Sequence, residues 1–445
     1  MKTPRFLLIT FSLSLGLGLF AQEQSNSTAW SLDKCIAFSL EKNIDVRKTA
    51  VVTDVDQQLI KQKQGLRYTN LSAGVDEGIG LTKVLNNNNR FGNYTSSKTT
   101  DASLNSNVTL YNGFKINNSI KQAQLAYKAS IYDAATTKEN ITLSVLNDYL
   151  QVIYAKELVN TSAEQIKSTT EQMKLAEERV TLGLLSRADY LTLKAQLANA
   201  KLILVNAESS YALAKLALMQ LMEFPVTSEF DIVYPDLSSF KNSSIVPDAE
   251  VVYKTALDIK PQIKSAALNK NIADLSVKIA RADLYPRLSL SGSVSTLYGS
   301  TFPGLSYSYQ LENRLTPSVD LTLSIPILQQ NQVKTAIQIA KLNTETAALN
   351  DINTRDQLRK AIEQASLNFS SAQTKYQASQ EKYDATKEAY EVSVEKFKLG
   401  LLSSSDFIIQ ETNLFSAESD LLQSKVNLIF SNKILDFYTG IPITL

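Results

Sequence analysis

The chain has 445 residues, enough for one large domain or two to three ordinary ones, so length alone fixes no domain division. Lysine plus arginine (45) nearly balance aspartate plus glutamate (44), so the chain lacks the basic field that polyanionic nucleic acid requires. The sequence contains no histidine, which removes the commonest general base and the commonest metal ligand. These counts disfavour nucleic-acid binding and most enzyme classes. No cofactor and no metal site are expected.

The N-terminal segment has the order of a secretory signal peptide. Lys2 and Arg5 precede an apolar run that ends at Leu19, and the small residue Ala21 follows, so residues 1–21 are assigned to this peptide. A signal anchor is the alternative, but the apolar run is shorter than the roughly 20 residues of a spanning helix. No later stretch is expected to match a transmembrane helix in length and apolarity, so a membrane span would have to consist of strands.

The single cysteine, Cys35, follows soon after the signal segment. One thiol forms neither an intramolecular disulfide nor a multi-thiolate metal site. We therefore interpret Cys35 as a small, buried, apolar residue.

Two long arms of the chain lack proline, one before Pro225 and one between Pro326 and Pro442. They are rich in Ala, Leu, Lys, Gln and Glu, with apolar residues three and four positions apart, which predicts long helices. One glycine interrupts each arm, so helical hairpins are expected at 115–223 and 331–439. A helix of this kind spans on the order of 100 Å, and several apolar stripes predict coiled-coil packing on two sides, as in a ring of helices.

The chain repeats itself at an offset of 217 residues. This shift aligns Glu178–Ser186 with Glu395–Ser403, and it also aligns Pro225 with Pro442. Because one offset serves nearly the whole chain, the sequence predicts an internal duplication. The expected organisation is a first repeat at 22–227, a connector at 228–249 and a second repeat at 250–445.

Each repeat begins with a helix and then changes its apolar period from about 3.6 to 2, which predicts strands. The expected strands are near 69–81, 102–112, 287–298 and 318–327. Apolar residues alternate in them with Ser, Thr and Asn, although Glu77 interrupts the first apolar face. A half-buried soluble sheet is one interpretation; segment length and a polar face suited to a wet lumen favour membrane strands. The polar connections 82–101 and 297–317 are expected to be exposed external loops.

Four strands do not close a membrane barrel, because the smallest such barrels use about eight. An open sheet edge is not tolerated in lipid, so the chain must oligomerise. Arithmetic alone permits eight strands from two copies or twelve from three.

The two interruptions of the helical arms carry the same motif. Leu-Gly-Leu-Leu-Ser occurs at Leu182–Ser186 and Leu399–Ser403, and aspartate follows three residues later. The glycine suits a helix C-terminus, and Ser with Asp suits a capping box that starts the next helix. With the Trp30-Ser-Leu-Asp-Lys-Cys-Ile-Ala opening and the Tyr285-Pro-Arg-Leu-Ser strand start, this pattern resembles the TolC family of outer-membrane factors over essentially the whole mature chain.

The resemblance implies a mainly α fold with a transmembrane β-barrel portion, built from tandem strand-strand-long-helix repeats. Three copies would form a twelve-stranded barrel on a periplasmic α-helical barrel, with an equatorial region near the connector. The implied function is an outer-membrane channel of a tripartite efflux or type I secretion system in a Gram-negative bacterium. Substrates would leave passively, powered by an inner-membrane transporter of RND or ABC type through a periplasmic adaptor. The resemblance implies no enzymatic activity.

The same resemblance assigns site residues. Adaptor docking falls on the two hairpin tips, at Leu182, Gly183, Leu184, Ser186, Leu399, Gly400, Leu401 and Ser403. Asp406 stands where relatives place a carboxylate at the periplasmic aperture; a helix cap is the alternative for this residue. Some relatives have a second acidic residue three positions on, where this chain has Ile409, so only one carboxylate ring is supported.

Two other classes are weighed against a duct. A secreted coiled-coil filament protein would share the Ala, Ser, Asn and Gln richness, but it needs neither paired strands nor matched glycine turns. An enzyme is the other alternative, and its catalytic groups would have to be acidic residues such as Glu177 and Glu178. These lie in charge-rich helical surroundings, which are typical of a solvated helix face.

Overall fold

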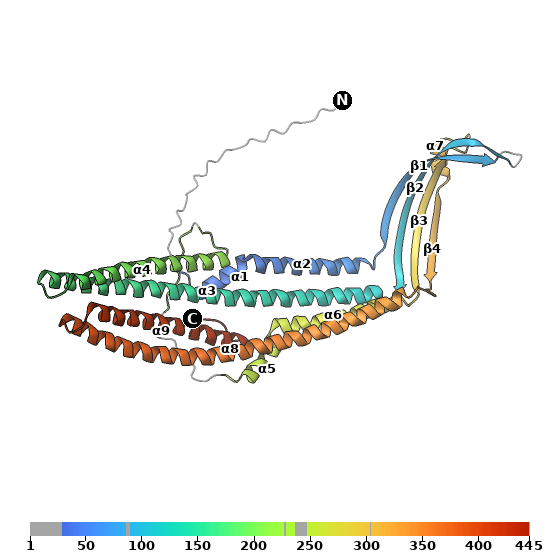
Figure 1. Ribbon diagram of the computed structural model, residues 1–445. Helices are drawn as coiled ribbons and strands as arrows, with labels where there is room; N and C mark the ends of the chain where they lie inside the picture. The colour runs from blue at the N-terminus through green and yellow to red at the C-terminus, as the bar shows by residue number, and fades with distance from the viewer. Residues whose placement is uncertain (1–28, 86–89, 227, 236–246, 303, 445) are drawn as a thin grey trace, which may run out of the picture.

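The computed structural model describes residues 29–85, 90–226, 228–235, 247–302 and 304–444. The expected signal peptide, residues 1–21, lies outside the described residues. The described chain is an elongated helical body with a sheet at one end and two helical hairpin tips at the other (Figure 1).

The helices form two sets of four, and each member of the second set begins 217 residues after its counterpart. The first set is α1 (Leu32–Lys42), α2 (Ile44–Gly65), α3 (Lys115–Thr181) and α4 (Arg187–Leu221). The second set is α5 (Ala249–Ile259), α6 (Pro261–Ala282), α8 (Gln332–Lys398) and α9 (Ser404–Thr439). A further short helix, α7 (Tyr307–Asn313), lies between two strands. The duplication predicted from the sequence is therefore present in the fold.

Polar caps set where these helices begin. Ser31 starts α1 and Asp248 starts α5, and each side-chain oxygen accepts a main-chain N–H of the first turn. Asn43 caps α2 in the same way and also donates from Nδ2 to the carbonyl of Leu221, 2.9 Å away, at the end of α4. This bond joins α2 and α4, so that they follow one another along the 67-residue α3.

Helix α4 corrects one expectation. It is long and apolar enough to cross a membrane by length and composition, although no stretch after the signal segment was expected to be so. Its apolar residues lie on several sides: Leu193 and Leu197 are buried, whereas Leu202, Val205 and Leu213 are exposed. One apolar face of α4 is therefore buried within the chain, and the other lies exposed on its surface.

The sheet has four antiparallel strands in the order β1-β2-β3-β4. They are β1 (Asn70–Leu85), β2 (Phe91–Asn112), β3 (Arg287–Gly299) and β4 (Thr316–Ser324). The ladder aligns Ser72, Asn105, Ser293 and Ser318 in one row, and the adjacent row on the opposite face is Ala73, Leu104, Val294 and Pro317. This register confirms one polar and one apolar face.

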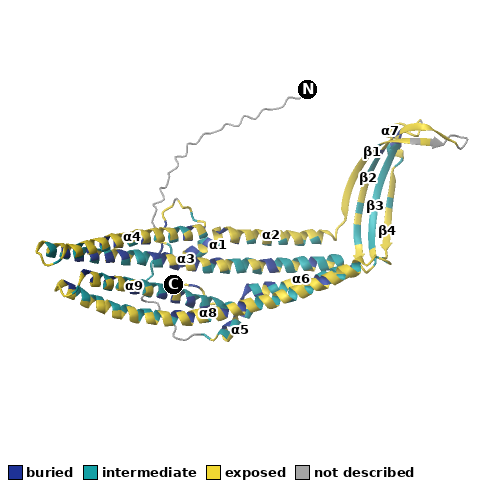
Figure 2. Cartoon of the chain, in the orientation of Figure 1, coloured by how far each residue is buried: buried dark blue, intermediate teal, exposed yellow. Residues whose placement is uncertain are grey.

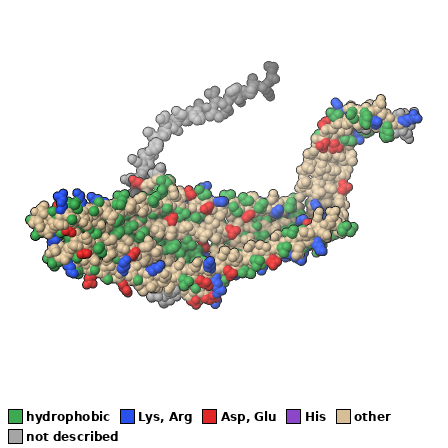
Figure 3. Space-filling view, in the orientation of Figure 1, with side chains coloured by type: hydrophobic (Ala, Val, Ile, Leu, Met, Phe, Trp, Pro, Cys, Tyr) green, Lys and Arg blue, Asp and Glu red, His purple; other side chains and the backbone are tan. Residues whose placement is uncertain are grey.

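The apolar face is open to solvent on the single chain. Ile79 of β1 and Val319 of β4 are 78% and 79% exposed, and exposed residues dominate both edge strands (Figure 2). In the view of Figure 3 most of the sheet is tan, the colour of the backbone and of side chains that are neither apolar nor charged. Glu77, which interrupts the apolar face, accepts a hydrogen bond from the Thr100 hydroxyl at 2.9 Å.

The segments 82–101 and 297–317, expected to be exposed external loops, contain more regular structure than the expected strand bounds implied. Strand β1 continues to Leu85 and β2 begins at Phe91, with Thr82 paired to Thr95, so most of 82–101 is hairpin ladder. Thr, Tyr and Phe favour extended backbone, and polar residues on both faces hid the alternation. Within 297–317, α7 is tied to β3, because the Gln310 side chain accepts the N–H of Gly299 at 3.0 Å.

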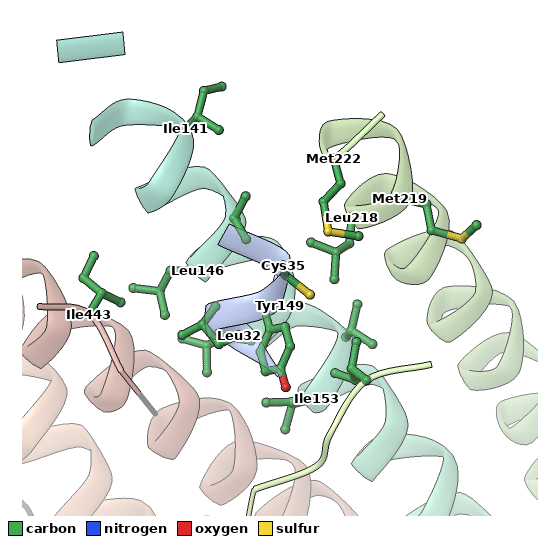
Figure 4. Close-up of a cluster of buried hydrophobic side chains, with 14 of the residues drawn as sticks. Leu32, Cys35, Ile141, Leu146, Tyr149, Ile153, Leu218, Met219, Met222 and Ile443 are labelled. Atoms are coloured by element: carbon green, nitrogen blue, oxygen red, sulfur yellow. The ribbon is translucent and has the colours of Figure 1, made fainter. Parts of the chain in front are cut away.

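The largest core lies midway along the body, where α1, α3 and α4 meet (Figure 4). The Tyr149 hydroxyl of α3 donates to the Val233 carbonyl at 2.6 Å and thereby fixes the segment after α4. Cys35 is fully buried beside it, as interpreted from the sequence, and burial raises the pKa of its thiol to about 12. This thiol therefore stays protonated and serves packing.

Candidate functional site

The two hairpin tips stop their first helices in the same way. Gly183 follows α3 with φ +72°, and Gly400 follows α8 with φ +77°. In each tip the next residue donates its N–H back into the last turn, Leu184 to Arg179 at 2.8 Å and Leu401 to Lys396 at 2.9 Å. A left-handed backbone costs other residues about 1–2 kcal/mol, so glycine is the residue this stop requires.

The second helix of each hairpin restarts on a serine cap. The Oγ atoms of Ser186 and Ser403 accept the N–H groups of Asp189 and Asp406, both at 3.1 Å. The two hydroxyls in turn donate to the carboxylates, at 2.6 and 2.8 Å. The capping interpretation of Asp406 is thus confirmed, and its carboxylate is favoured at the positive end of the α9 dipole.

Apolar side chains point outward at both tips. Leu182, Leu184, Leu399 and Leu401 are 72–73% exposed, although each is a large aliphatic residue. Such exposed groups on a narrow tip are available for contact with another molecule.

Beneath the tips a compact apolar cluster joins the two hairpins. Its buried members come from all four helices: Ala176, Leu193, Phe397 and Phe407. The rings of Phe397 and Phe407 stack with centroids 4.9 Å apart. Leu185 and Leu402, the fourth residues of the two motifs, pack against this tip cluster. The two tips therefore form one platform.

Arg179 also holds the platform together. Its guanidinium, on α3, donates to the main-chain carbonyls of Phe397 (2.6 Å) and Lys398 at the end of α8. Carbonyls in a last helical turn lack partners within the helix. The Phe397 carbonyl also accepts the Gly400 N–H at 3.0 Å, and Arg179 adds a charged donor from the other hairpin. Arg179 was not among the predicted site residues, although the repeat aligns it with another basic residue, Lys396.

A second missed residue is Glu411 of α9, which lies between the hairpins. Its side chain is 3% exposed, accepts the Thr169 hydroxyl of α3 at 2.8 Å and lies 3.5 Å from Nε2 of Gln196 on α4. Burial raises the pKa of this carboxyl above its ordinary range, and the two hydrogen bonds offset only part of that effect. The sequence does mark this position, because the first repeat has a basic residue, Lys194, where the second repeat has the acidic Glu411.

Among the described residues no group of three or more His, Cys, Asp or Glu could hold a metal ion. The tip motifs themselves offer leucine, glycine and serine, whose roles here are exposed apolar surface, backbone turning and helix capping.

Tandem duplication, long helical hairpins and a two-faced sheet together give this chain the architecture of an outer-membrane channel protein. The outer membrane efflux protein family model matches residues 36–222 and 252–440, one block in each repeat. The chain belongs to this family.

Individual relatives of known name are similar to this chain in sequence. The chain is 25% identical over 292 residues to toxin and drug export protein A of Aggregatibacter actinomycetemcomitans, covering 64% of this chain and 61% of that protein. It is 22% identical over 357 residues to outer membrane protein TolC of Salmonella enteritidis, covering 77% and 67%. The match thus spans less than two thirds of the first relative's length.

The fold is similar to that of the Campylobacter jejuni CmeC outer membrane channel, with a TM-score of 0.77, 18% identity, and coverage of 98% of this chain and 94% of that one. The CusC channel gives a TM-score of 0.78 at 15% identity, covering 93% and 92%. These likenesses confirm the fold class predicted from the sequence.

Proposed function

We propose that this chain is one protomer of a homotrimeric outer-membrane duct of an efflux or type I secretion system, with its helical barrel in the periplasm. An inner-membrane transporter supplies the energy and a periplasmic adaptor links it to the duct. Substrate moves passively through the water-filled lumen. The first relative is named a toxin and drug export protein, and this name supports efflux as the class of transport.

The single observation that carries this proposal is the two-faced sheet with unpaired edges. Its apolar face is exposed on one chain, and β1 and β4 have no neighbour on their outer sides among the described strands. In lipid such edges must pair, and three copies of four strands give a closed barrel of twelve. The polar row that includes Ser72 and Ser293 would then line the lumen.

Membrane fractionation tests this assembly. The mature protein should remain in the outer membrane after carbonate or high-salt washing and should run in mild detergent as a heat-modifiable oligomer. A protein released by washing, as expected of the alternative coiled-coil filament protein, would contradict the duct. Purified protein in planar bilayers should also conduct ions.

The eight tip residues Leu182, Gly183, Leu184, Ser186, Leu399, Gly400, Leu401 and Ser403 form the adaptor-docking surface in this proposal. Leu184 and Leu401 occupy equivalent positions in the two tips and are each 73% exposed, so the double change Leu184→Glu, Leu401→Glu should abolish export and adaptor cross-linking while leaving the oligomer intact. Lys174→Ala, an exposed change further along α3, serves as the matched control. Unchanged cross-linking in the double variant would remove the tips from the docking surface.

Asp406 is proposed to lie at the periplasmic aperture as well as to cap α9. The first hairpin provides a matched control, since Asp189 makes the same cap. Asp406→Asn should lower the cation preference of the conductance, whereas Asp189→Asn should leave it unchanged. An unchanged cation preference in both variants would mean that Asp406, like Asp189, acts only at its helix cap.

A further inference from the structure

The two hairpins of one protomer meet along a polar seam above the tip cluster. On α3 the residues Ser162, Gln165, Thr169 and Gln172 recur every three or four positions, so they share one face, and all four are buried. The Oε1 atoms of Gln165 and Gln172 have no hydrogen-bond partner among the described residues. A contact made of such groups releases less free energy than an apolar one, because both amides regain hydrogen bonds when water enters.

Glu411 contributes a buried carboxyl group to this seam. Its hydrogen-bond partners, the Thr169 hydroxyl of α3 and the Gln196 amide of α4, are both neutral. A carboxylate at 3% exposure with neutral partners is disfavoured relative to the protonated acid. In the arrangement described here the seam therefore favours a proton on Glu411.

Among the residues that the structure describes, no cation contributes to the shift of the Glu411 pKa. Tyr390 of α8 lies close enough that the Glu411 charge adds to burial in raising the pKa of its phenol, and Glu171 of α3 acts on the same phenol. On α4 the charged residue closest to Gln196 in sequence is Lys194, whose side chain is exposed to water. Further along α9, burial raises the pKa of Glu418, partly offset by Lys387 of α8.

We propose that protonation of Glu411 keeps the second hairpin (α8–α9) seated on the first (α3–α4), and that its ionisation at higher pH loosens the periplasmic end of the duct. The seated state binds the proton more tightly than a state in which Glu411 is hydrated. Seating is therefore strongest below the ordinary glutamate pKa of about 4.3, and it weakens as pH rises to the elevated pKa of the seated form. Within that window the loosened-to-seated ratio changes at most about tenfold per pH unit for each protomer.

The first test does not depend on channel function. Thermal unfolding of the purified detergent-solubilised protein is followed across pH for the wild type and Glu411→Gln, which keeps the shape and removes the charge. The two proteins should coincide at low pH, and the wild type should become progressively less stable than the variant as pH rises. Glu388→Gln, at an exposed position of α8, should show no such divergence. A pH-independent difference between wild type and Glu411→Gln would overturn the proposal.

The second test rests on the proposed function. Open probability in planar bilayers should rise with pH for the wild type and stay at its low-pH value for Glu411→Gln. If the stability curves diverge but both proteins share one conductance profile, Glu411 titrates without moving the gate, and the proposal is refuted while the duct stands. Absence of conductance in both proteins would instead count against the duct, and the stability curves would still decide whether Glu411 titrates in the seam.

Discussion

The first hairpin (α3–α4) and the second hairpin (α8–α9) have the same turn at their tips, but the side chains that pack beneath the two turns differ. Phe407 and Ser404 of the second hairpin are fully buried, whereas their duplicates Tyr190 and Arg187 are partly or fully exposed. The first hairpin in turn supplies the Arg179 clamp. Local turn chemistry therefore persisted through the duplication, while the packing below it diverged. The second hairpin provides the buried anchor residues Phe407 and Ser404, and the first provides the Arg179 clamp.

The buried rings provide the largest expected contrast. Phe407→Ala removes a fully buried ring that stacks on Phe397 and should cost about 3–5 kcal/mol of unfolding free energy. Tyr190→Ala, at the duplicate position, should cost markedly less because that ring is only partly buried. Chemical unfolding of the two variants measures the difference, and equal costs would break the asymmetry.

The Arg179 clamp should rank second. Arg179→Ala leaves two α8 carbonyls without this donor, and charge-assisted hydrogen bonds contribute about 1.5–3 kcal/mol each when buried, so about 1–2 kcal/mol is expected at this half-exposed site. The duplicate Lys396→Ala, on an exposed side chain, should stay within about 0.5 kcal/mol of wild type. Limited proteolysis at the tips gives a second measure: only Arg179→Ala should speed cleavage near residue 398.

The glycine turns should behave alike. Gly183→Ala and Gly400→Ala each force a side chain into left-handed backbone, at a cost of about 1–2 kcal/mol, and a Cβ at either position meets no atom within 4 Å. Equal losses of stability in the two variants would confirm that the turns are independent of the packing below. A larger loss at Gly400 would show that the anchor also constrains its turn.

The serine caps should give the smallest effect, again matched. Ser186→Ala and Ser403→Ala each remove one N-cap and should cost about 1 kcal/mol. Helix fraying, followed by amide exchange in the first turns of α4 and α9, should increase similarly in both. Fraying confined to one hairpin would mean that tertiary contacts replace the cap in the other.

What the sequence predicts well here is what local chemistry determines. The Leu-Gly-Leu-Leu-Ser turns, their serine caps and the period-two strands follow from residue types a few positions apart, and the register confirms the faces. The roles of Arg179 and Glu411 depend on which helices meet, which spacing along one helix does not specify. The β1–β2 pairing beyond residue 81 was not predicted. Polar residues on both faces of this part of the ladder hide the alternation that identifies a strand.

The order of the sheet also has a genetic consequence. Each chain offers β1 on one edge and β4 on the other, so in the proposed ring β4 of one copy meets β1 of the next in a head-to-tail contact. A chain whose β4 does not pair would still be accepted through its intact β1. One such copy would leave a gap in any ring it joined, so a defective allele is expected to be dominant over the normal one.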